Sequence, residues 1–406
     1  MKKPDRITEL LTRGVAEVIV KDDLEEKLRS GKKLRVKFGI DPTWNLLHLG
    51  HSVALLKLKE FQNLGHTVIF LIGDHTAEIG DPSGRSKERT PLSQDQIKEN
   101  MASYREQAGH VIDFKKVEVR YNSEWYDRLG IREFADLTSK ITIPQILQRA
   151  DFKKRLKEGG DVSAREAFYP LLQGYDSVML KADVELGGTD QKFNLLMGRQ
   201  IQKRYGQKEQ DIITVELLEG TDGSAKMSKT ADNFIAITES AEIMYGKVMS
   251  IPDSLIGKYF VLTTRVPMNE VGEIEEQMKK NTLNPRDAKM HLAREIVTLY
   301  HGAKKAGQAE ENFIALFQKK ELPDDMPTIK LKKKEWPIVD LMVETNLASS
   351  KSEARRLIAQ KGVVMRRPGA QSDTAMNDPA LVILPEDIAK GFVIKRGKRH
   401  FVAITS

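Results

Sequence analysis

The chain contains no cysteine among its 406 residues. Disulfide bridges, thiolate-bound zinc and iron–sulfur clusters are therefore excluded, and a reducing compartment such as the cytoplasm is expected. Long apolar runs are also missing. The most apolar stretch, residues 68–72, is far too short to cross a bilayer, and the charged first residues are not followed by an apolar run. We therefore expect neither a signal peptide nor a membrane partner.

An excess of either charge is missing from most of the chain. The net charge is +7, and residues 330–406 account for all of it, with 15 Lys and Arg against 8 Asp and Glu. A basic region on a neutral body suggests a polyanionic partner that is bound through its phosphates. A solvated, lysine-rich surface explains the same charge equally well on this observation alone.

Short apolar runs alternate with helical periodicity in the first half of the chain, which predicts an α/β fold with a Rossmann-like parallel sheet. Strands are expected at residues 33–40, 67–73 and 116–121, and helices at residues 7–30, 51–63 and 133–158. A strand, a helix and a second strand in this order form a βαβ unit with a right-handed crossover.

The length of the chain exceeds what one compact core usually holds, so two or three domains are expected. Residues 1–235 are predicted to form the Rossmann-like domain, and residues 236–321 a helical domain without strands. Residues 322–337 contain three prolines and a lysine run, which is typical of a linker. Residues 338–406 have their own apolar pattern and are predicted to form a small α+β domain.

Two histidines stand where a helix is expected to begin after the first predicted strand. Residues 48–51 read His-Leu-Gly-His and follow an Asp-Pro-Thr turn at residues 41–43. A helix N-terminus attracts phosphate, Gly50 lets a flat ring approach the backbone, and both histidines can donate to phosphate oxygens. Ordinary helix-cap histidines or a metal-binding pair are the alternatives, and the metal is less favoured because no third ligand lies nearby.

Two lysines lie on a loop rich in glycine and serine. Residues 226–229 read Lys-Met-Ser-Lys and follow Thr-Asp-Gly-Ser at residues 221–224. Such lysines can move onto a pyrophosphate leaving group and stabilise its charge. A solvated loop surface is the alternative, and for a lysine pair alone it is the commoner one.

Together, and in this order within one α/β domain, the two motifs resemble the signatures of class I aminoacyl-tRNA synthetases. The pattern Tyr169, Gln173 and Asp176 places three polar groups on one helical face, which suits an amino group and a phenol. With residues 187–191 (Gly-Gly-Thr-Asp-Gln) and Asp81, the resemblance is to bacterial tyrosyl-tRNA synthetases with a Lys-Met-Ser-Lys motif, and it covers nearly the whole chain.

The resemblance implies how the amino acid would be bound. Asp81, Tyr169 and Gln173 would hold the ammonium group of tyrosine, Asp176 would accept the hydrogen bond of the phenol, and Gln191 would lie near the carboxylate.

The resemblance also implies the contacts of ATP. Phosphates and ribose would meet Thr43, His48 and His51, with Gly50 beneath them, and Asp190 would bind the ribose of the adenylate. The departing pyrophosphate would be held by Lys226 and Lys229, helped by Arg85 and Arg89.

One position departs from the family pattern. Many members carry a tyrosine four residues before the aspartate of the Asp-Pro-Thr turn, where its hydroxyl also meets the phenol, but this chain has Lys37 followed by Phe38. Asp176 would therefore recognise the phenol with less help, or another group would take the place of the missing hydroxyl.

The basic C-terminal region has a second resemblance, to the RNA-binding module of a small-subunit ribosomal protein of the S-four type. Residues 347–358 read as a capped helix with Lys351, Arg355 and Arg356 expected to face phosphate. A basic helix without function is the alternative.

The resemblance implies a tyrosine–tRNA ligase used in protein synthesis. Its substrates would be tyrosine, ATP with Mg²⁺ and tRNA(Tyr), and it would have no protein-bound metal cage. A homodimer is implied, with residues 125–165 at the interface. Tryptophan activation, or RNA binding without amino-acid activation, are the rival interpretations. Asp176 and the basic tail disfavour the first, and the intact histidine and lysine motifs disfavour the second.

Overall fold

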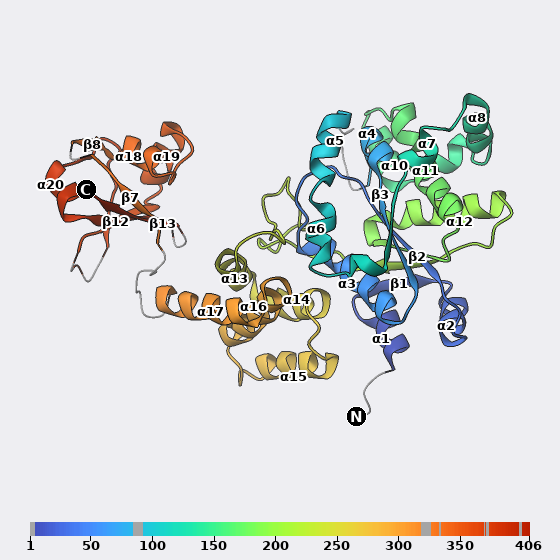
Figure 1. Ribbon diagram of the computed structural model, residues 1–406, viewed down its shortest axis with the longest axis horizontal. Helices are drawn as coiled ribbons and strands as arrows, with labels where there is room; N and C mark the ends of the chain where they lie inside the picture. The colour runs from blue at the N-terminus through green and yellow to red at the C-terminus, as the bar shows by residue number, and fades with distance from the viewer. Residues whose placement is uncertain are drawn as a thin grey trace. The chain divides into compact units, whose positions relative to one another are not determined.

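The computed structural model describes residues 5–83, 92–317, 326–332, 334–368, 370, 373–397 and 400–406. The chain divides into two compact units, residues 1–307 and residues 308–406, which are described separately below (Figure 1).

The first unit is built on a six-stranded sheet with the strand order β1-β6-β5-β2-β3-β4. All neighbouring strands are parallel except the edge strand β1, which runs antiparallel to β6. The strands are β1 Val15–Ile19, β2 Arg35–Ile40, β3 Thr67–Ile72, β4 Val117–Tyr121, β5 Val184–Gly188 and β6 Asp211–Val215. Figure 1 shows helices on both sides of this sheet. The predicted α/β fold with a Rossmann-like parallel sheet is therefore confirmed.

The central strands are apolar because both of their faces are covered. In β3 every residue after Thr67 is buried, and α3 (Leu49–Asn63) packs against it. The chain runs outward from β2 through β3 to β4, and then returns to the other side of β2 with β5 and β6. The strand order reverses between β2 and β5, and ligands bind at the carboxyl ends of the strands beside such a reversal.

The expected helix over residues 7–30 is wrong in its middle. The segment forms α1 (Arg6–Thr12), β1 and α2 (Lys21–Arg29). Gly14 has a φ of +62°, which ends the helical path. The β-branched residues that follow it pair with β6, where Val15 lies opposite Val215.

Helices fill the connections of the sheet. Those before β4 are α4 Asp74–Ile79, α5 Gln94–Met101 and α6 Tyr104–Gly109. Those between β4 and β6 are α7 Ser123–Tyr126, α8 Ile131–Ser139, α9 Ile143–Ile146, α10 Ala150–Lys157, α11 Ala164–Leu180 and α12 Lys192–Arg204. Three of them, α8, α9 and α10, occupy the range predicted to be helical at residues 133–158. The two longest, α11 and α12, pack on each other and carry much of the candidate site.

After β6, the described residues up to 317 form helices and no further strand: α13 Ala241–Met249, α14 Ile256–Thr263, α15 Met268–Lys279, α16 Pro285–His301 and α17 Ala303–Phe317. Their apolar faces bury Tyr245, Tyr259 and Phe260. The prediction of helices without strands at residues 236–321 is thus confirmed for its described residues, while the domain boundaries stay a prediction.

The second unit has a core of its own around α18 (Ile338–Glu344) and α19 (Lys351–Ala359). Its five-stranded sheet has the order β10-β9-β12-β13-β7, and β11 pairs with β8. The elements are β7 Thr328–Lys330, β8 Trp336–Pro337, β9 Val363–Arg366, β10 Thr374–Ala375, β11 Val382–Ile383, α20 Pro385–Lys390, β12 Phe392–Arg396 and β13 His400–Thr405. Two of the strands, β7 and β8, lie within residues 322–337, the predicted linker. Strand β7 adds in parallel to β13, and β8 pairs with β11. The S-four likeness of this unit stays a prediction.

Candidate active site

A cavity of about 700 Å³ opens where β2 and β5 end, at the reversal of strand order. It is lined by these strand ends, the loop after β2, the start of α3, one face of α11 and the loop at residues 226–230. The structure brings together here the predicted residues Thr43, His48, Gly50, His51, Asp81, Tyr169, Gln173, Asp176, Asp190, Gln191, Lys226 and Lys229. Arg85 and Arg89 lie outside the described residues.

The wall of the cavity beside the end of β2 is acidic. Asp41, the first residue after β2, accepts hydrogen bonds from Tyr169 Oη (2.9 Å) and Thr76 Oγ1 (2.8 Å). Burial, together with the nearby charge of Asp81, raises the pKa of Asp41 to about 7, although the hydrogen bonds from Thr76 and Tyr169 act in the opposite direction. Burial and the charges of Asp41 and Asp81 also raise the pKa of Tyr169 well above its usual value. This wall repels negative charge and suits a cation.

The inner part of the cavity contains a second carboxyl group, Asp176 on α11. It accepts from Trp125 Nε1 (3.0 Å) and, at 3.5 Å, from Asn122 Nδ2. Burial raises the pKa of Asp176 to about 6, whereas the charge of Lys37 and these hydrogen bonds act in the opposite direction. The side chain is therefore fixed in orientation, and above a pH of about 6 it is an acceptor only.

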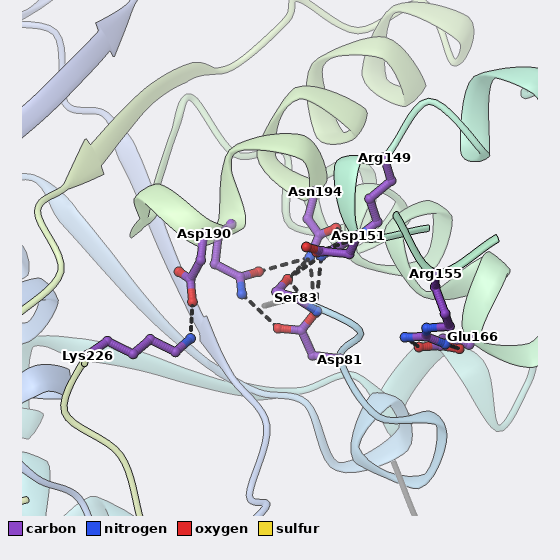
Figure 2. A network of polar contacts seen from close by, with 10 residues as sticks. Asp81, Ser83, Arg149, Asp151, Arg155, Glu166, Asp190, Asn194 and Lys226 are labelled. Carbon is purple, nitrogen blue, oxygen red and sulfur yellow. Dashed lines mark hydrogen bonds and ion pairs between the residues drawn. The ribbon is translucent and has the colours of Figure 1, made fainter. Parts of the chain in front are cut away.

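A buried arginine organises the side of the cavity near α12. Arg149 Nη2 donates to Ser83 Oγ (2.6 Å) and Nη1 to Asn194 Oδ1 (2.5 Å). Asp81 Oδ1 accepts from Ser83 Oγ (2.6 Å), and Asp81 Oδ2 accepts from Gln191 Nε2 (2.7 Å). Figure 2 shows these side chains converging from separate parts of the chain. Asp81 and Gln191 are thus preorganised next to each other.

The two histidines of residues 48–51 are packed together at the start of α3, with ring centroids 3.9 Å apart. Burial lowers the pKa of His48 to about 2 and that of His51 to about 4, and the charge of Lys226 adds to both shifts. Both rings are therefore neutral at physiological pH. His51 Nδ1 accepts from the His48 backbone N–H (3.2 Å), which leaves its Nε2 as the donor. Buried His48 Nδ1 has no partner among the described residues.

Gly50 leaves room for one of these rings. A Cβ atom at this position would lie 2.9 Å from His48 Nδ1 and 3.6 Å from Met227 Cβ. The flat ring that approaches the backbone here is therefore that of His48 itself. Any larger residue at position 50 would displace the histidine or the loop that carries Met227.

The lysine loop faces the histidines across the mouth of the cavity. Lys226 Nζ lies 2.7 Å from Asp190 Oδ2. Figure 2 shows the two side chains pointing toward each other. The ammonium of Lys229 lies over the ring of Trp44, 4.7 Å from its centroid. Between them, Met227 is buried, and the backbone N–H of Ser228 donates to Asn233 Oδ1 (2.8 Å). The loop is anchored at its centre while both ammonium groups stay exposed.

Lys37 lies at the inner end of the same cavity and is fully buried. Its Nζ atom forms an ion pair with Glu185 Oε1 at 2.8 Å. The sequence marked Lys37 as a departure from the family pattern but gave no partner for it.

The predicted RNA-binding residues lie in the second unit, on α19. Lys351, Arg355 and Arg356 are exposed, and Lys351 Nζ pairs with Asp340 Oδ1 at 2.7 Å. Arg396 and Glu353 form another ion pair at 3.4 Å beside them. The helix therefore presents two adjacent arginines and a lysine that is already partly neutralised.

Within the described ranges, no three side chains of His, Asp or Glu are arranged to hold a metal ion. A helix long and apolar enough to cross a membrane is likewise not found in the part of the chain that the structure describes.

Several residues of the site were not identified from the sequence: Asp41, Thr76, Asn122, Trp125, Arg149, Glu185 and Asn194. A usable signal existed for two of them, because Asp41 and Asn122 directly follow the parallel strands β2 and β4, whose carboxyl ends form the ligand edge of such a sheet. The others become part of the site only through tertiary contacts.

Comparisons with known proteins agree with this geometry. A family model described as tRNA synthetases class I (W and Y) matches residues 29–318, and one described as tyrosine--tRNA ligase SYY-like C-terminal domain matches residues 318–404. The chain is 47% identical to the tyrosine--tRNA ligase of Thermotoga maritima over 402 residues, which cover 99% of this chain and 98% of that one. It is also 47% identical to the tyrosine--tRNA ligase of Carboxydothermus hydrogenoformans, with 98% and 97% covered.

The solved structures that resemble this chain include tyrosyl-tRNA synthetases. The C-terminally truncated mitochondrial tyrosyl-tRNA synthetase of Aspergillus nidulans superposes with a TM-score of 0.65 and 26% identity, covering 78% of this chain and 95% of that chain. The corresponding protein of Coccidioides posadasii gives a TM-score of 0.63 and 26% identity, with 76% and 92% covered.

Proposed function

Because the chain belongs to the class I tRNA synthetases of the tryptophan and tyrosine type, and within them to the tyrosine–tRNA ligases, we propose that its cavity joins tyrosine to tRNA(Tyr) in two steps. The tyrosine carboxylate attacks the α-phosphate of ATP, which gives tyrosyl-adenylate and releases pyrophosphate. The terminal ribose of the tRNA then takes the tyrosyl group and releases AMP. The observation that carries this proposal is that one cavity contains both the histidine and the lysine motif together with a carboxylate-rich amino-acid pocket.

The acidic wall binds the ammonium group of tyrosine. Asp81, Tyr169 and Gln173 line the cavity next to one another, and buried Asp41 adds negative charge behind the Tyr169 hydroxyl. Arg149 and Gln191 keep Asp81 in place, and Gln191 remains close enough to meet the substrate carboxylate. Asp176, fixed by Trp125, accepts the hydrogen bond of the phenol.

ATP occupies the mouth of the cavity, where α3 begins. His48 and His51 act there as neutral hydrogen-bond donors to phosphate, since burial keeps both rings uncharged. Thr43 adds a further donor, the positive end of the α3 dipole favours phosphate, and Gly50 keeps the His48 ring in position. Asp190 binds the ribose once Lys226 has left it.

Positioning and charge stabilisation account for the chemistry without a covalent enzyme intermediate. Lys226 and Lys229 turn from Asp190 and Trp44 onto the β- and γ-phosphates as negative charge builds up on the leaving pyrophosphate. ATP would enter as its Mg²⁺ complex, and the metal would supply positive charge that offsets the charge of the phosphates. Arg85 and Arg89, which lie outside the described residues, are proposed to help hold the pyrophosphate.

The remaining parts of the proposal concern partners. The exposed face of α19 contacts tRNA phosphates through Arg355 and Arg356. Exposed apolar side chains at residues 125–165, among them Ile131 (81% exposed) and Ile143 (59% exposed), support a homodimer interface there. The cytoplasm is the proposed location.

ATP–pyrophosphate exchange, measured separately with tyrosine, tryptophan and phenylalanine, tests the proposed function. Tyrosine is expected to support exchange far better than the other two. Exchange that follows tryptophan would assign the chain to the other branch of the family. The absence of exchange with all three, alongside tRNA binding, would indicate an RNA-binding protein that does not activate amino acids.

A further inference from the structure

A buried ion pair forms the inner end of the amino-acid pocket. Lys37 on β2 and Glu185 on β5 are directly opposite each other in the parallel register, so both side chains leave the same face of the sheet. Their Nζ and Oε1 atoms are 2.8 Å apart, and each side chain is 1% exposed. Both residues line the cavity next to Asp176.

Helix α11 holds this pair in place. Lys37 Nζ donates to Ser177 Oγ (2.9 Å) and to the backbone carbonyl of Gln173 (3.1 Å). Glu185 accepts from Ser177 Oγ (3.1 Å), from Gln173 Nε2 (3.2 Å) and from Gln210 Nε2. The same helix carries Gln173 and Asp176, so the ion pair and the predicted substrate contacts form one rigid unit.

Stability alone does not explain the pair. Removing two charges from water costs several kcal/mol each, and well-packed apolar residues of similar volume often stabilise a fold at least as well. The position of the pair on the wall of a substrate cavity therefore points to recognition.

We propose that Lys37, held by Glu185, is a specificity-determining residue that donates a hydrogen bond to the phenol oxygen of the substrate. This inference rests on the proposed function, in which tyrosine is activated. A phenol hydroxyl has one proton to donate and lone pairs to accept with. Asp176 as a carboxylate can only accept, and an ammonium can only donate, so the two side chains complement both halves of the hydroxyl.

Lys37 can make this contact without leaving a buried group unpaired. Its three donors are shared among Glu185, Ser177 and the carbonyl of Gln173, and the bond to Gln173 is the longest. That carbonyl lies inside α11 and already accepts the helical hydrogen bond of the residue four positions later. The phenol oxygen can therefore replace it. Phenylalanine would fill the same space but would neither donate to Asp176 nor accept from Lys37, so it lacks two hydrogen bonds to charged groups that tyrosine makes.

The inference is tested with three variants in the full chain. Lys37→Met removes the donors, Lys37→Met with Glu185→Met also restores neutrality, and Lys37→Gln with Glu185→Gln returns an uncharged donor. Lys27→Met is the matched control, because Lys27 forms a buried pair with Asp211 of the same sheet (2.5 Å, side chains 8% and 1% exposed) outside the cavity. The readouts are kcat/KM for tyrosine and for phenylalanine in ATP–pyrophosphate exchange, KM for ATP, and Tm.

The ratio of kcat/KM for tyrosine to that for phenylalanine is expected to fall about 10- to 100-fold in both methionine variants at position 37. The double glutamine variant should recover about tenfold of this loss, and KM for ATP should stay unchanged in all of them. Lys27→Met should lower Tm but leave the ratio at its wild-type value.

A ratio that stays within about twofold of wild type in the folded, neutral double methionine variant would overturn the inference, because loss of a hydrogen bond in a dry pocket has a larger effect. Glutamine variants no better than methionine variants would also overturn it. Neither result touches the proposed function, which fails only if the wild-type protein shows no tyrosine-dependent exchange.

Discussion

Two lysine–carboxylate pairs at opposite ends of one cavity differ mainly in their exposure to water. The Lys37–Glu185 pair at the inner end has side chains that are 1% and 1% exposed, whereas the Lys226–Asp190 pair at the mouth has side chains that are 43% and 22% exposed. Their N–O distances are nearly equal, at 2.8 and 2.7 Å. Distance therefore does not distinguish them, but the dielectric around them does.

The difference in exposure suits the inner pair to substrate recognition and the outer pair to the chemical step. A buried pair that is enclosed by helix α11 cannot open without leaving charges unpaired in a dry interior, so it is suited to a fixed role such as selecting the substrate. An exposed pair has a net stability of about 0–1 kcal/mol and exchanges partners readily. Lys226 can therefore leave Asp190 for a phosphate group, as its proposed role in stabilising the leaving pyrophosphate requires.

The largest expected effect concerns the outer pair. Replacing Lys226 and Lys229 by methionine should lower kcat of ATP–pyrophosphate exchange by about 10²- to 10³-fold, because stabilisation of the leaving group is lost in the transition state. Tyrosine affinity and Tm should stay close to wild type, since both side chains are exposed. Lys203→Met, which removes an exposed lysine paired with Glu209 far from the cavity lining, is the control. A large loss of tyrosine affinity in the double variant would contradict the division between the two pairs.

Next in size is the loss of the acceptor beside the inner pair. Asp176→Ala should raise the KM for tyrosine about 10- to 100-fold, because the hydrogen bond of the phenol to a charged acceptor is lost and the ammonium of Lys37 cannot accept the phenol proton. The KM for ATP should change little. Asp253→Ala removes a carboxylate that pairs with Lys289 outside the cavity, and serves as the control. Equal changes in both KM values would count against the role of Asp176.

A third effect concerns the pH dependence of the acidic wall. The pKa of Asp41 is raised by burial to about 7, so its protonated form dominates below that pH and the charge that attracts the ammonium group is lost. Accordingly, kcat/KM for tyrosine should fall by up to about tenfold per pH unit as the pH drops from about 7 to about 6. It should fall more steeply below about 6, where Asp176 is protonated as well. His48 and His51, with pKa values of about 2 and 4, stay neutral throughout this range and add no inflection.

The control for the pH profile is a carboxylate just beyond the carboxyl end of the neighbouring strand. Asp74 lies two residues after the end of β3, whereas Asp41 directly follows β2, and Asp74 does not line the cavity. Asp41→Asn should remove the inflection near pH 7, whereas Asp74→Asn should keep it. An unchanged profile in Asp41→Asn would assign the inflection to another group.

The sequence predicted the parts of this molecule that depend on local signals. Strands β2 and β3 are apolar runs bounded by turn residues, and the His-Leu-Gly-His and Lys-Met-Ser-Lys motifs are each continuous in sequence. Strand β1 was predicted as helix, because Val15, Val18 and Ile19 fit a helical face as well as a strand. Only pairing with β6, almost two hundred residues later in the chain, decides between the two.

Prediction of the candidate site was limited in the same way to local sequence signals. The motif residues were identified, but the side chains that contact and orient them were not. Trp125, Arg149 and Glu185 are ordinary residues in sequence, and each becomes functional by meeting Asp176, Asp81 or Lys37 across the fold. Lys37 shows the limit most clearly, since its departure from the family pattern was visible while the carboxylate that neutralises it was not.

The smallest expected effect extends the comparison to a third lysine pair, Lys351–Asp340 in the second unit, with side chains 60% and 39% exposed. If exposure lets such pairs exchange partners, the basic side chains of α19 should exchange their carboxylate partners and bound water for tRNA phosphates. Replacing Lys351, Arg355 and Arg356 by alanine should weaken tRNA binding about 3- to 10-fold and reduce the slope of log K against log salt by about 2, with Lys351 contributing least because Asp340 already neutralises it. Tyrosine-dependent exchange should be unaffected. Lys390→Ala, at the exposed end of α20, is the control, and an unchanged salt slope in the triple variant would show that α19 does not contact phosphate.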